Sequence, residues 1–307
     1  MASLNDLSYA DALVNLELLA RQVVEGFITG LHKSPFHGFS VEFAEHRAYN
    51  PGDNIKNIDW KLYAKTDKLF VKRFEEETNL RCQLVIDTSS SMYFPRDSTV
   101  NKLQFAVRSA ASLMYLLKRQ RDAFGLSLFD ETLYTHTKAA STTAHTKYMY
   151  GHLETALKAS KLNTQTNIES ALHQVAEAIP KRSLIILFSD MLNTALDDEK
   201  TAAIFAAIQH LKFNKHEIVI FNITDHAREV NFEFENRPYQ FVDMESGKIL
   251  KVQPHQVKES YLNNMATYRN KLQLKCAQYH IDLVDADIAK GYETVLQAYL
   301  IKRQKML

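Results

Sequence analysis

The spacing of hydrophobic positions changes along the chain, and each change predicts a different element. Hydrophobic residues between 11 and 31 recur at steps of three and four, which predicts an amphipathic helix that ends near Gly30. Residues 35–74 carry short strand-like runs instead, interrupted by an Asn-Pro-Gly-Asp turn signal at 50–53. The beginning of the chain is therefore predicted to form a helix followed by a small β-rich module.

From residue 79 onward, apolar strand-like runs alternate with helical patterns, which is the order expected for a parallel sheet covered by helices. The predicted strands lie near 84–86, 124–129, 184–188, 217–222 and 281–284, and the predicted helices near 103–117, 147–160, 168–178, 197–212, 256–279 and 293–303. The run at 184–188 is apolar throughout, which is typical of a central strand buried on both faces.

These patterns predict the α/β fold class and a division of the chain into two parts. Residues 1–77 are assigned to the N-terminal helix and the β-rich module. Residues 78–307 are assigned to a mostly parallel, Rossmann-like sheet with helices on both faces. A β insertion at about 226–255, with a hairpin turn at 245–248, interrupts the second part.

Composition and charge exclude several classes of function. Hydrophobic residues make up 46% and charged residues 24% of the chain, which is typical of a globular protein. The 37 basic and 36 acidic residues give a net charge of +1, so we expect no binding to nucleic acid. No apolar run approaches the ~18 residues of a membrane span, and the first residues carry no signal-peptide pattern. We therefore expect a cytoplasmic protein without membrane insertion.

Polar side chains with oxygen ligands follow the first predicted buried strand. Asp87, Ser89 and Ser91 form an Asp-x-Ser-x-Ser motif where the strand ends, the usual ligand-binding position of open α/β sheets. Thr166 precedes a predicted helix, and Asp190 ends another predicted strand. Because parallel strands end at one edge of a sheet, these loops are expected to meet there. Carboxylate and hydroxyl oxygens suit a hard cation such as Mg²⁺ or Mn²⁺.

The total charge of these ligands indicates what the ion could do. Two carboxylates and three neutral hydroxyls only just neutralise a divalent cation, so an acidic side chain of a partner protein could take a vacant coordination position. Ordinary helix capping and turn formation also account for such residues after a strand. Thr164 is an alternative to Thr166 as the threonine that faces the ion.

The five residues together resemble the metal-ion-dependent adhesion site of von Willebrand factor type A domains. The resemblance implies that the metal ligands are Asp87, Ser89, Ser91, Thr166 and Asp190. It also implies a von Willebrand type A-like fold and a metal ion that is shared between two proteins.

The segment before the motif resembles the hallmark run of the family called domain of unknown function fifty-eight. The matching stretches are Arg47–Asp53, Ile58–Lys61, Ala64–Thr66 and Val71–Glu77, and Val242–Gly247 resembles the late β insertion of that family. Members join this run directly to a von Willebrand type A-like domain and commonly occur beside MoxR-type AAA+ ATPases. The resemblance therefore implies an adaptor or remodelling role with such an ATPase as partner.

The sequence favours an interaction protein over an enzyme. It contains no phosphate-binding glycine-rich loop, no His-Glu-x-x-His and no Gly-x-Ser-x-Gly elbow. The strongest enzymatic alternative is a Mg²⁺-dependent phosphohydrolase with Asp87 as covalent nucleophile, but such enzymes place a second carboxylate where this chain has Ser89. A third alternative is a metal-free scaffold in which only the fold serves.

Overall fold

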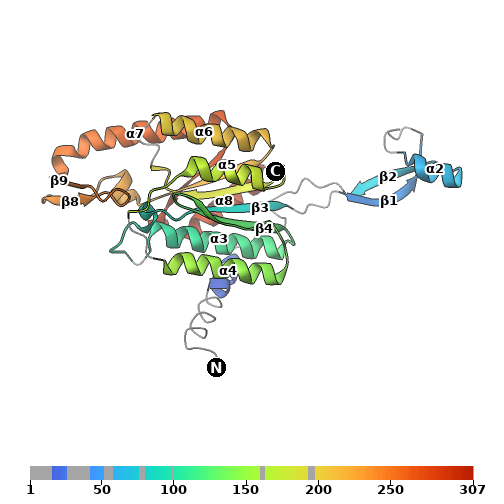
Figure 1. Cartoon of the computed structure of the whole chain (residues 1–307), viewed down its shortest axis with the longest axis horizontal. Coiled ribbons are helices and arrows are strands. Elements are labelled where there is room, and N and C mark those ends of the chain that lie inside the picture. The colour runs from blue at the N-terminus through green and yellow to red at the C-terminus, as the bar shows by residue number, and fades with distance from the viewer. Residues whose placement is uncertain are drawn as a thin grey trace, which may run out of the picture. The chain divides into compact units, whose positions relative to one another are not determined.

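The computed structural model describes residues 16–25, 42–51, 58–75, 80–98, 100–159, 163–192 and 198–306. They divide into two compact units (Figure 1): a small one between residues 36 and 80, and a large one formed by the remainder. Outside the described residues lie the predicted helix positions 11–15 and 26–31, residues 52 and 53 of the predicted turn, and residues 76 and 77 of the hallmark run.

The small unit is an antiparallel strand pair with one short helix between the strands in the chain. Strand β1 (Glu42–Ala48) pairs with β2 (Phe70–Glu75), and helix α2 (Trp60–Thr66) precedes β2. Asp59 caps this helix, because its carboxylate accepts hydrogen bonds from two backbone N–H groups of the first turn. The sequence pattern predicted only strand-like runs here, since a helix of two turns is too short to show a hydrophobic period.

The large unit is built on a six-stranded sheet with the strand order β10-β7-β6-β3-β4-β5. Its parallel strands are β3 (Arg81–Asp87), β4 (Ala123–Phe129), β6 (Leu184–Ser189), β7 (Glu217–Thr224) and β10 (Asp282–Asp287). Strand β5 (Leu133–His136), which the pattern did not predict, pairs antiparallel with β4 at one edge. Strand β4 lies on one side of β3 and β6 lies on the other, so the direction in which successive strands are added to the sheet reverses at β3.

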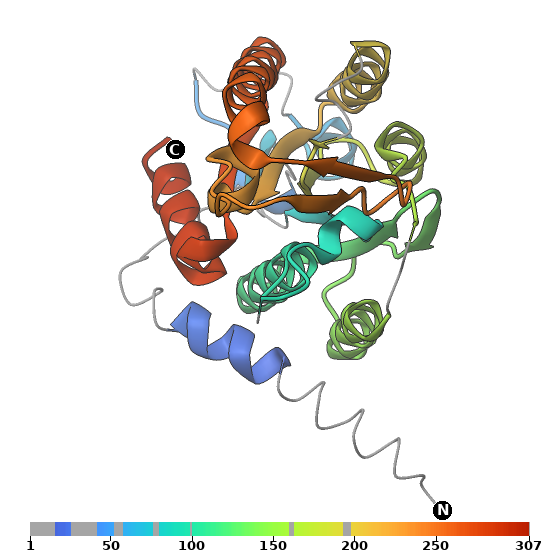
Figure 2. The same cartoon turned by 90° about the vertical axis from the view of Figure 1, so that its left-hand side faces the viewer.

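Helices cover both faces of this sheet (Figure 2). One face carries α3 (Lys102–Arg119), α4 (Thr143–Lys158) and α8 (Tyr292–Met306), and the other carries α5 (Ile168–Ala178), α6 (Asp198–Phe213) and α7 (Pro254–Gln278). The topology confirms the predicted α/β fold class, a mostly parallel sheet with helices on both faces.

The core lies on both sides of β6, whose residues are all buried, as the continuous apolar run predicted. Ile185 and Leu187 face the α5, α6 and α7 layer, where they join one hydrophobic cluster. On the opposite face, Phe188 stacks on Phe221 at 4.9 Å between ring centroids, and Phe221 meets Tyr299 of α8 at 5.2 Å.

The helix of residues 16–25 packs on α3 of the large unit. Its Ala20 and Val24 are fully buried. The Tyr115 hydroxyl donates a hydrogen bond to Glu25 at 3.2 Å, and the Lys118 ammonium donates to Glu17 at 3.4 Å. The predicted division after residue 77 placed this helix with the β-rich module, whereas these contacts place it with the large unit.

The segment predicted as a β insertion begins with a π-helical turn (His226–Val230). Strands β8 (Tyr239–Val242) and β9 (Ile249–Val252) then form an antiparallel hairpin. Its turn needs Gly247, whose φ of 70° lies in the left-handed region. Within the described part of the chain, no helix combines the length and the apolar character that crossing a membrane requires.

Candidate metal centre

The candidate centre lies at the edge of the sheet where the parallel strands end, here called the carboxyl edge. Strand β3 ends at Asp87, and a 3-10 turn (Ser90–Tyr93) follows directly. The Ser89 backbone N–H donates to Asp87 Oδ1 at 2.9 Å, which fixes the carboxylate and turns the chain. The hydroxyl oxygens of Ser89 and Ser91 then lie 3.1 Å apart. The Asp-x-Ser-x-Ser motif thus gathers its three oxygen-bearing side chains at one point.

Two further hydroxyls converge on the same carboxylate. Thr166 Oγ1 donates to Asp87 Oδ2 at 3.0 Å, and Ser189 Oγ, at the end of β6, donates to it at 2.9 Å. Thr164 holds the loop in place through its backbone: its N–H donates to Ser90 Oγ at 2.7 Å, and its carbonyl accepts from the Ser90 N–H at 3.1 Å. The hydroxyl of Thr166 is therefore the one brought to Asp87.

Asp190 follows β6 and is buried at the same edge. Its Oδ1 accepts from the Leu192 N–H at 3.3 Å. Burial of Asp87, together with the nearby charge of Asp190, raises the pKa of Asp87 to about 6. Asp87 therefore forms hydrogen bonds with Ser89 and Thr166, and it lies close enough to Asp190 for the two carboxylates to repel each other.

A buried lysine, which the sequence interpretation did not single out, completes the surroundings of Asp190. Lys102 Nζ donates to Asp190 Oδ2 at 2.6 Å and to Glu229 Oε1, in the insertion, at 2.8 Å. Burial disfavours the charged ammonium, but the two carboxylates outweigh this effect and raise the pKa of Lys102. The sequence offers one clue to the role of Lys102, which is its position as the first residue of α3. A cation at a helix N-terminus is disfavoured by the helix dipole and therefore needs an acidic partner nearby.

The charges of this cluster sum to a value that a divalent ion would neutralise. When ionised, the carboxylates of Asp87, Asp190 and Glu229 and the ammonium of Lys102 give a formal charge of −2. Burial raises the pKa of Glu229 even beside Lys102, so negative charge is costly throughout the cluster. Among the described residues Asp87 has no Lys, Arg or His partner; its hydrogen bonds come from Ser89, Thr166 and Ser189.

These donors fit a hard cation that keeps much of its hydration. In the part of the chain that the structure describes, no cluster of three or more His, Cys, Asp or Glu side chains is arranged to hold a metal. An ion at Asp87 would therefore depend on hydroxyls and water as further ligands, which is the preference of Mg²⁺ rather than Zn²⁺. The buried carboxylate of Asp87, which has no cationic partner among the described residues, would be stabilised by a bound cation.

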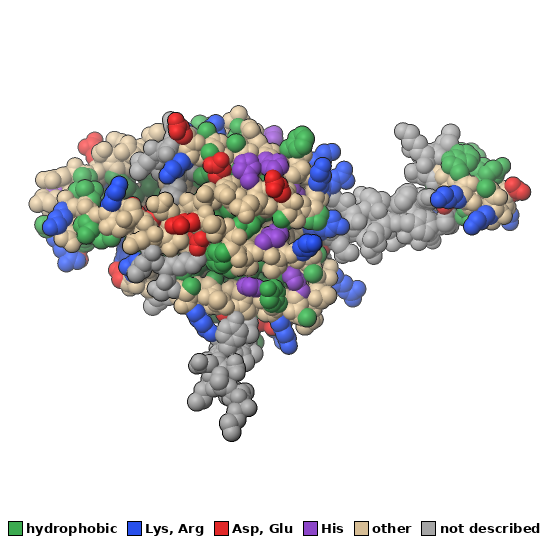
Figure 3. All heavy atoms as spheres, viewed as in Figure 1, with side chains coloured by type: hydrophobic (Ala, Val, Ile, Leu, Met, Phe, Trp, Pro, Cys, Tyr) green, Lys and Arg blue, Asp and Glu red, His purple; other side chains and the backbone are tan. Residues whose placement is uncertain are grey.

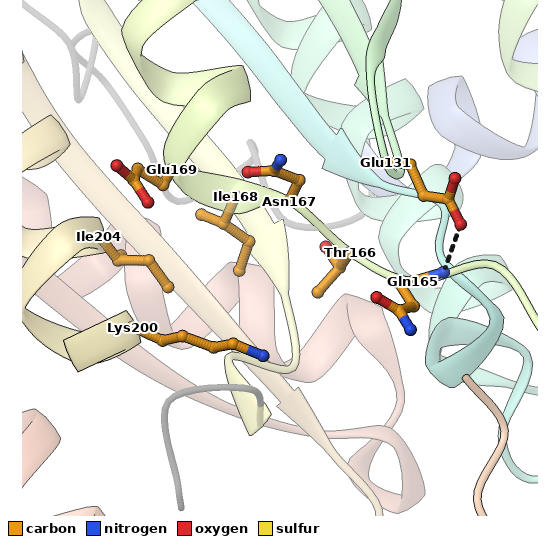
Figure 4. Close-up of a pocket in the computed structure, with 8 residues that line it drawn as sticks. All are labelled: Glu131, Gln165, Thr166, Asn167, Ile168, Glu169, Lys200 and Ile204. Carbon is orange, nitrogen blue, oxygen red and sulfur yellow. Dashed lines mark hydrogen bonds between the residues drawn. The ribbon is translucent and has the colours of Figure 1, made fainter. Parts of the chain in front are cut away.

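A pocket of about 440 Å³ opens beside Thr166 (Figure 4). It is lined by Glu131, Gln165, Thr166, Asn167, Ile168, Glu169, Lys200 and Ile204. The Gln165 N–H donates to Glu131 Oε1 at 3.2 Å, which fixes one wall, and Lys200 extends from α6 toward the loop that carries Thr166. The edge of the candidate centre is thus accessible from solvent on this side.

The fold and the site define an α/β protein with an oxygen-rich, negatively charged centre at the carboxyl edge of its sheet. The chain matches the family described as "Protein of unknown function DUF58" over residues 45–271, and it belongs to that family. This match confirms the family predicted from the hallmark run, and it includes residues of both units.

Curated relatives match this chain over part of its sequence. The uncharacterized proteins Mb1516 of Mycobacterium bovis and Rv1480 of Mycobacterium tuberculosis are each 26% identical over 189 residues, which cover 62% of this chain and 59% of theirs. The matched part of the chain thus spans 59% of the length of these relatives.

Solved structures that the chain resembles include the following three. An aerotolerance-related membrane protein from Bacteroides fragilis has 14% identity and a TM-score of 0.42, with 74% of this chain and 100% of that chain covered. BatB from Bacteroides thetaiotaomicron has 16% identity and a TM-score of 0.42, with 74% and 99% covered. The pilus adhesin SpaC from Lactobacillus rhamnosus GG has 14% identity and a TM-score of 0.42, with 76% and 30% covered. Similarity at this level concerns the fold alone.

Proposed function

We propose that this protein is a non-enzymatic adaptor that binds a protein partner through a divalent metal ion at the carboxyl edge of its sheet. The observation that carries the proposal is the buried carboxylate of Asp87, on which the Thr166 and Ser189 hydroxyls and the Ser89 amide converge without a cationic partner among the described residues. A divalent ion would remove the cost of that buried charge.

The ion, Mg²⁺ or Mn²⁺, would be held by Asp87, Ser89, Ser91, Thr166 and Asp190. When bound, it supplies a coordination position that a carboxylate can occupy. Asp190 enters this set with one oxygen already engaged by Lys102. An acidic side chain of the partner would take the vacant coordination position, and metal and partner would then stabilise each other's binding.

The proposed partner system follows from the family resemblance. A MoxR-type AAA+ ATPase would supply the energy of remodelling, while this chain docks on the client through the metal. Location in the cytoplasm remains a prediction from the sequence.

The phosphohydrolase alternative has a specific weakness in this geometry. Ser89 stands where a general acid is needed, and it donates its backbone N–H to Asp87 rather than a proton to a leaving group. Both oxygens of Asp87 are engaged in hydrogen bonds, and its side chain is fully buried. These contacts support a role as ligand over a role as exposed nucleophile.

The proposal is tested by affinity purification of the tagged full chain in excess Mg²⁺. We expect partners captured by the wild type to be absent with Asp87→Ala, and absent from the wild type in excess chelator. Asp282→Asn is the matched control, because Asp282 starts β10 at the opposite end of the parallel strands and pairs with Lys302. Recovery of the same partners with Asp87→Ala or in chelator would contradict the proposal.

The two threonines of the 163–167 loop give a sharper prediction for the metal itself. Thr166→Val should weaken Mg²⁺ binding by about tenfold or more, because it removes a hydroxyl that contacts Asp87. Thr164→Val should leave it unchanged, since the contacts of Thr164 to Ser90 run through its backbone. Isothermal titration calorimetry with Mg²⁺ measures both, and equal losses in the two variants would refute the assignment of Thr166.

A further inference from the structure

Two histidines face each other across neighbouring helices, neither of which carries a proposed ligand of the candidate metal centre. His173 lies on α5 and His210 lies on α6, and both residues are partly exposed. Their Nδ1 atoms are 3.2 Å apart, and their ring centroids are 5.4 Å apart with 41° between the ring planes. In the space-filling view, His side chains form a patch on the face where α5 and α6 lie (Figure 3). The pair therefore presents two metal-ligating nitrogens close to solvent.

The separation of the two nitrogens fits a bound ion as well as it fits a hydrogen bond. Without an ion, one ring donates its Nδ1–H to the Nδ1 lone pair of the other. A tetrahedral ion that binds two imidazoles at about 2.0–2.1 Å holds their nitrogens about 3.3 Å apart. The observed separation of 3.2 Å is close to that value, so an ion would replace the shared proton without movement of either helix.

Contacts on both sides of α6 fix this geometry. About one turn beyond the histidines, Asn214 Nδ2 donates to the Ala176 carbonyl at 3.3 Å and links the ends of α5 and α6. On the other side of α6, Gln209 Nε2 donates to the Tyr279 hydroxyl at the end of α7 at 2.8 Å. Phe205 stacks on the same tyrosine at 5.6 Å between ring centroids. The helices thus hold the two imidazoles in place, which is the preorganisation that a metal site needs.

The charges on the two helix faces favour a cation. On α5, Glu169 and Glu177 lie one turn before and one turn after His173, and both are exposed. On α6, the positions one turn before and one turn after His210 carry an alanine and an asparagine, neither of which is charged. The neighbours of the pair on these faces therefore add negative charge and no positive charge.

Imidazole nitrogens select the class of ion. They suit Zn²⁺, Cu²⁺ and Ni²⁺, whereas Mg²⁺ prefers oxygen ligands. Over the residues that the structure describes, no third His, Cys, Asp or Glu side chain joins the pair in a metal-binding cluster. An ion held by the pair would therefore take its remaining ligands from water.

We propose that His173 and His210 form a second metal site, which binds a divalent transition-metal ion such as Zn²⁺ through their two Nδ1 atoms. When the ion binds, the donor ring exchanges its Nδ1 proton for one on Nε2, so no net proton is released. Both Nδ1 lone pairs then face the ion. The site does not depend on the centre proposed at Asp87, and the two differ in the class of ion that they bind.

The test measures Zn²⁺ binding to the full chain by isothermal titration calorimetry in excess Mg²⁺, which occupies sites that prefer oxygen ligands. We expect one Zn²⁺ per chain. We expect its affinity to fall by about tenfold or more in His173→Gln and in His210→Gln, because each variant removes one of two protein ligands. Both residues are partly exposed and glutamine is a good helix former, so neither variant should unfold the protein.

The control His255→Gln changes an exposed histidine at the start of α7 and should bind Zn²⁺ like the wild type. Nitrogen-15 NMR of the wild type adds a readout of the rings themselves, since Zn²⁺ should bring both to the Nε2–H tautomer. Equal Zn²⁺ affinity in His173→Gln, His210→Gln and wild type would overturn the proposal, as would the absence of saturable binding to the wild type. Asp87→Ala should keep the full Zn²⁺ response, and its loss there would place Zn²⁺ at the oxygen-rich centre instead.

Discussion

Replacing Asp87 with Ala is expected to abolish the stabilisation of this protein by Mg²⁺ or Mn²⁺. In the wild type, an ion that binds only the folded state should raise the free energy of unfolding by about 2.7 kcal/mol at a concentration of about a hundred times Kd. Asp87 is the carboxylate on which the Ser89 amide and the Thr166 hydroxyl converge, so no ligand of comparable charge replaces it. Thermal unfolding with increasing metal concentration measures the effect.

The same experiment has a predicted pH dependence. Burial and the charge of Asp190 raise the pKa of Asp87 to about 6, above the ordinary range of an aspartate. The folded state therefore binds a proton more tightly than the unfolded state. The metal-free wild type should lose stability as pH rises from about 4 to about 6, by about 3 kcal/mol at most. The stabilisation by Mg²⁺ should shrink below pH 6, because protons then compete for the carboxylate.

Two variants separate metal binding from general stability. Asp87→Asn removes the buried charge, so the metal-free variant should lack the loss of stability between pH 4 and 6 and should gain nothing from Mg²⁺. Asp282→Asn, at the other end of the strands, should keep the full response. If neither ion stabilises the wild type at neutral pH, the metal-free scaffold is favoured over the proposed centre.

The predictable part of this structure is the part set by local pattern. Helix α5 spans 168–178 as predicted, because Asn167 caps it and its hydrophobic residues recur at helical spacing. The placement of Asp87 and Asp190 at one edge followed from one topological rule, that parallel strands end at the same edge. Neither prediction needed long-range side-chain contacts.

The part that could not be predicted depends on contacts between distant segments. The bond between Lys102 and Glu229 joins the start of α3 to the insertion, and nothing near either residue in the sequence signals the other. Whether Thr164 or Thr166 faces Asp87 is settled by a backbone pairing between Thr164 and Ser90, which no side-chain pattern reveals. Strand β5 is a partly exposed edge strand of four residues, too short for a clear alternation.

Lys102 gives the second large prediction, which concerns stability without metal. Lys102→Met removes the cation shared by Asp190 and Glu229 and leaves two largely buried carboxylates facing each other. Breaking a buried pair in this way should lower the free energy of unfolding by about 3–5 kcal/mol. Urea unfolding of the metal-free protein at neutral pH measures it. The control Lys118→Met removes a half-exposed ion pair with Glu17 and should cost about 1 kcal/mol or less.

The double variant Lys102→Met, Glu229→Gln should recover much of this loss, because only Asp190 then keeps a negative charge beside the new methionine. It also keeps the test decisive if Lys102→Met alone does not fold. Mg²⁺ should stabilise both variants more than it stabilises the wild type, since Lys102 no longer occupies Asp190 Oδ2 and the ion no longer competes with an ammonium group. A smaller response to Mg²⁺ in both variants would mean that Lys102 supports the metal site rather than competing for its aspartate. In that case the −2 charge of the cluster would not be what attracts the ion. The hydroxyl ligands alone would then have to account for metal binding.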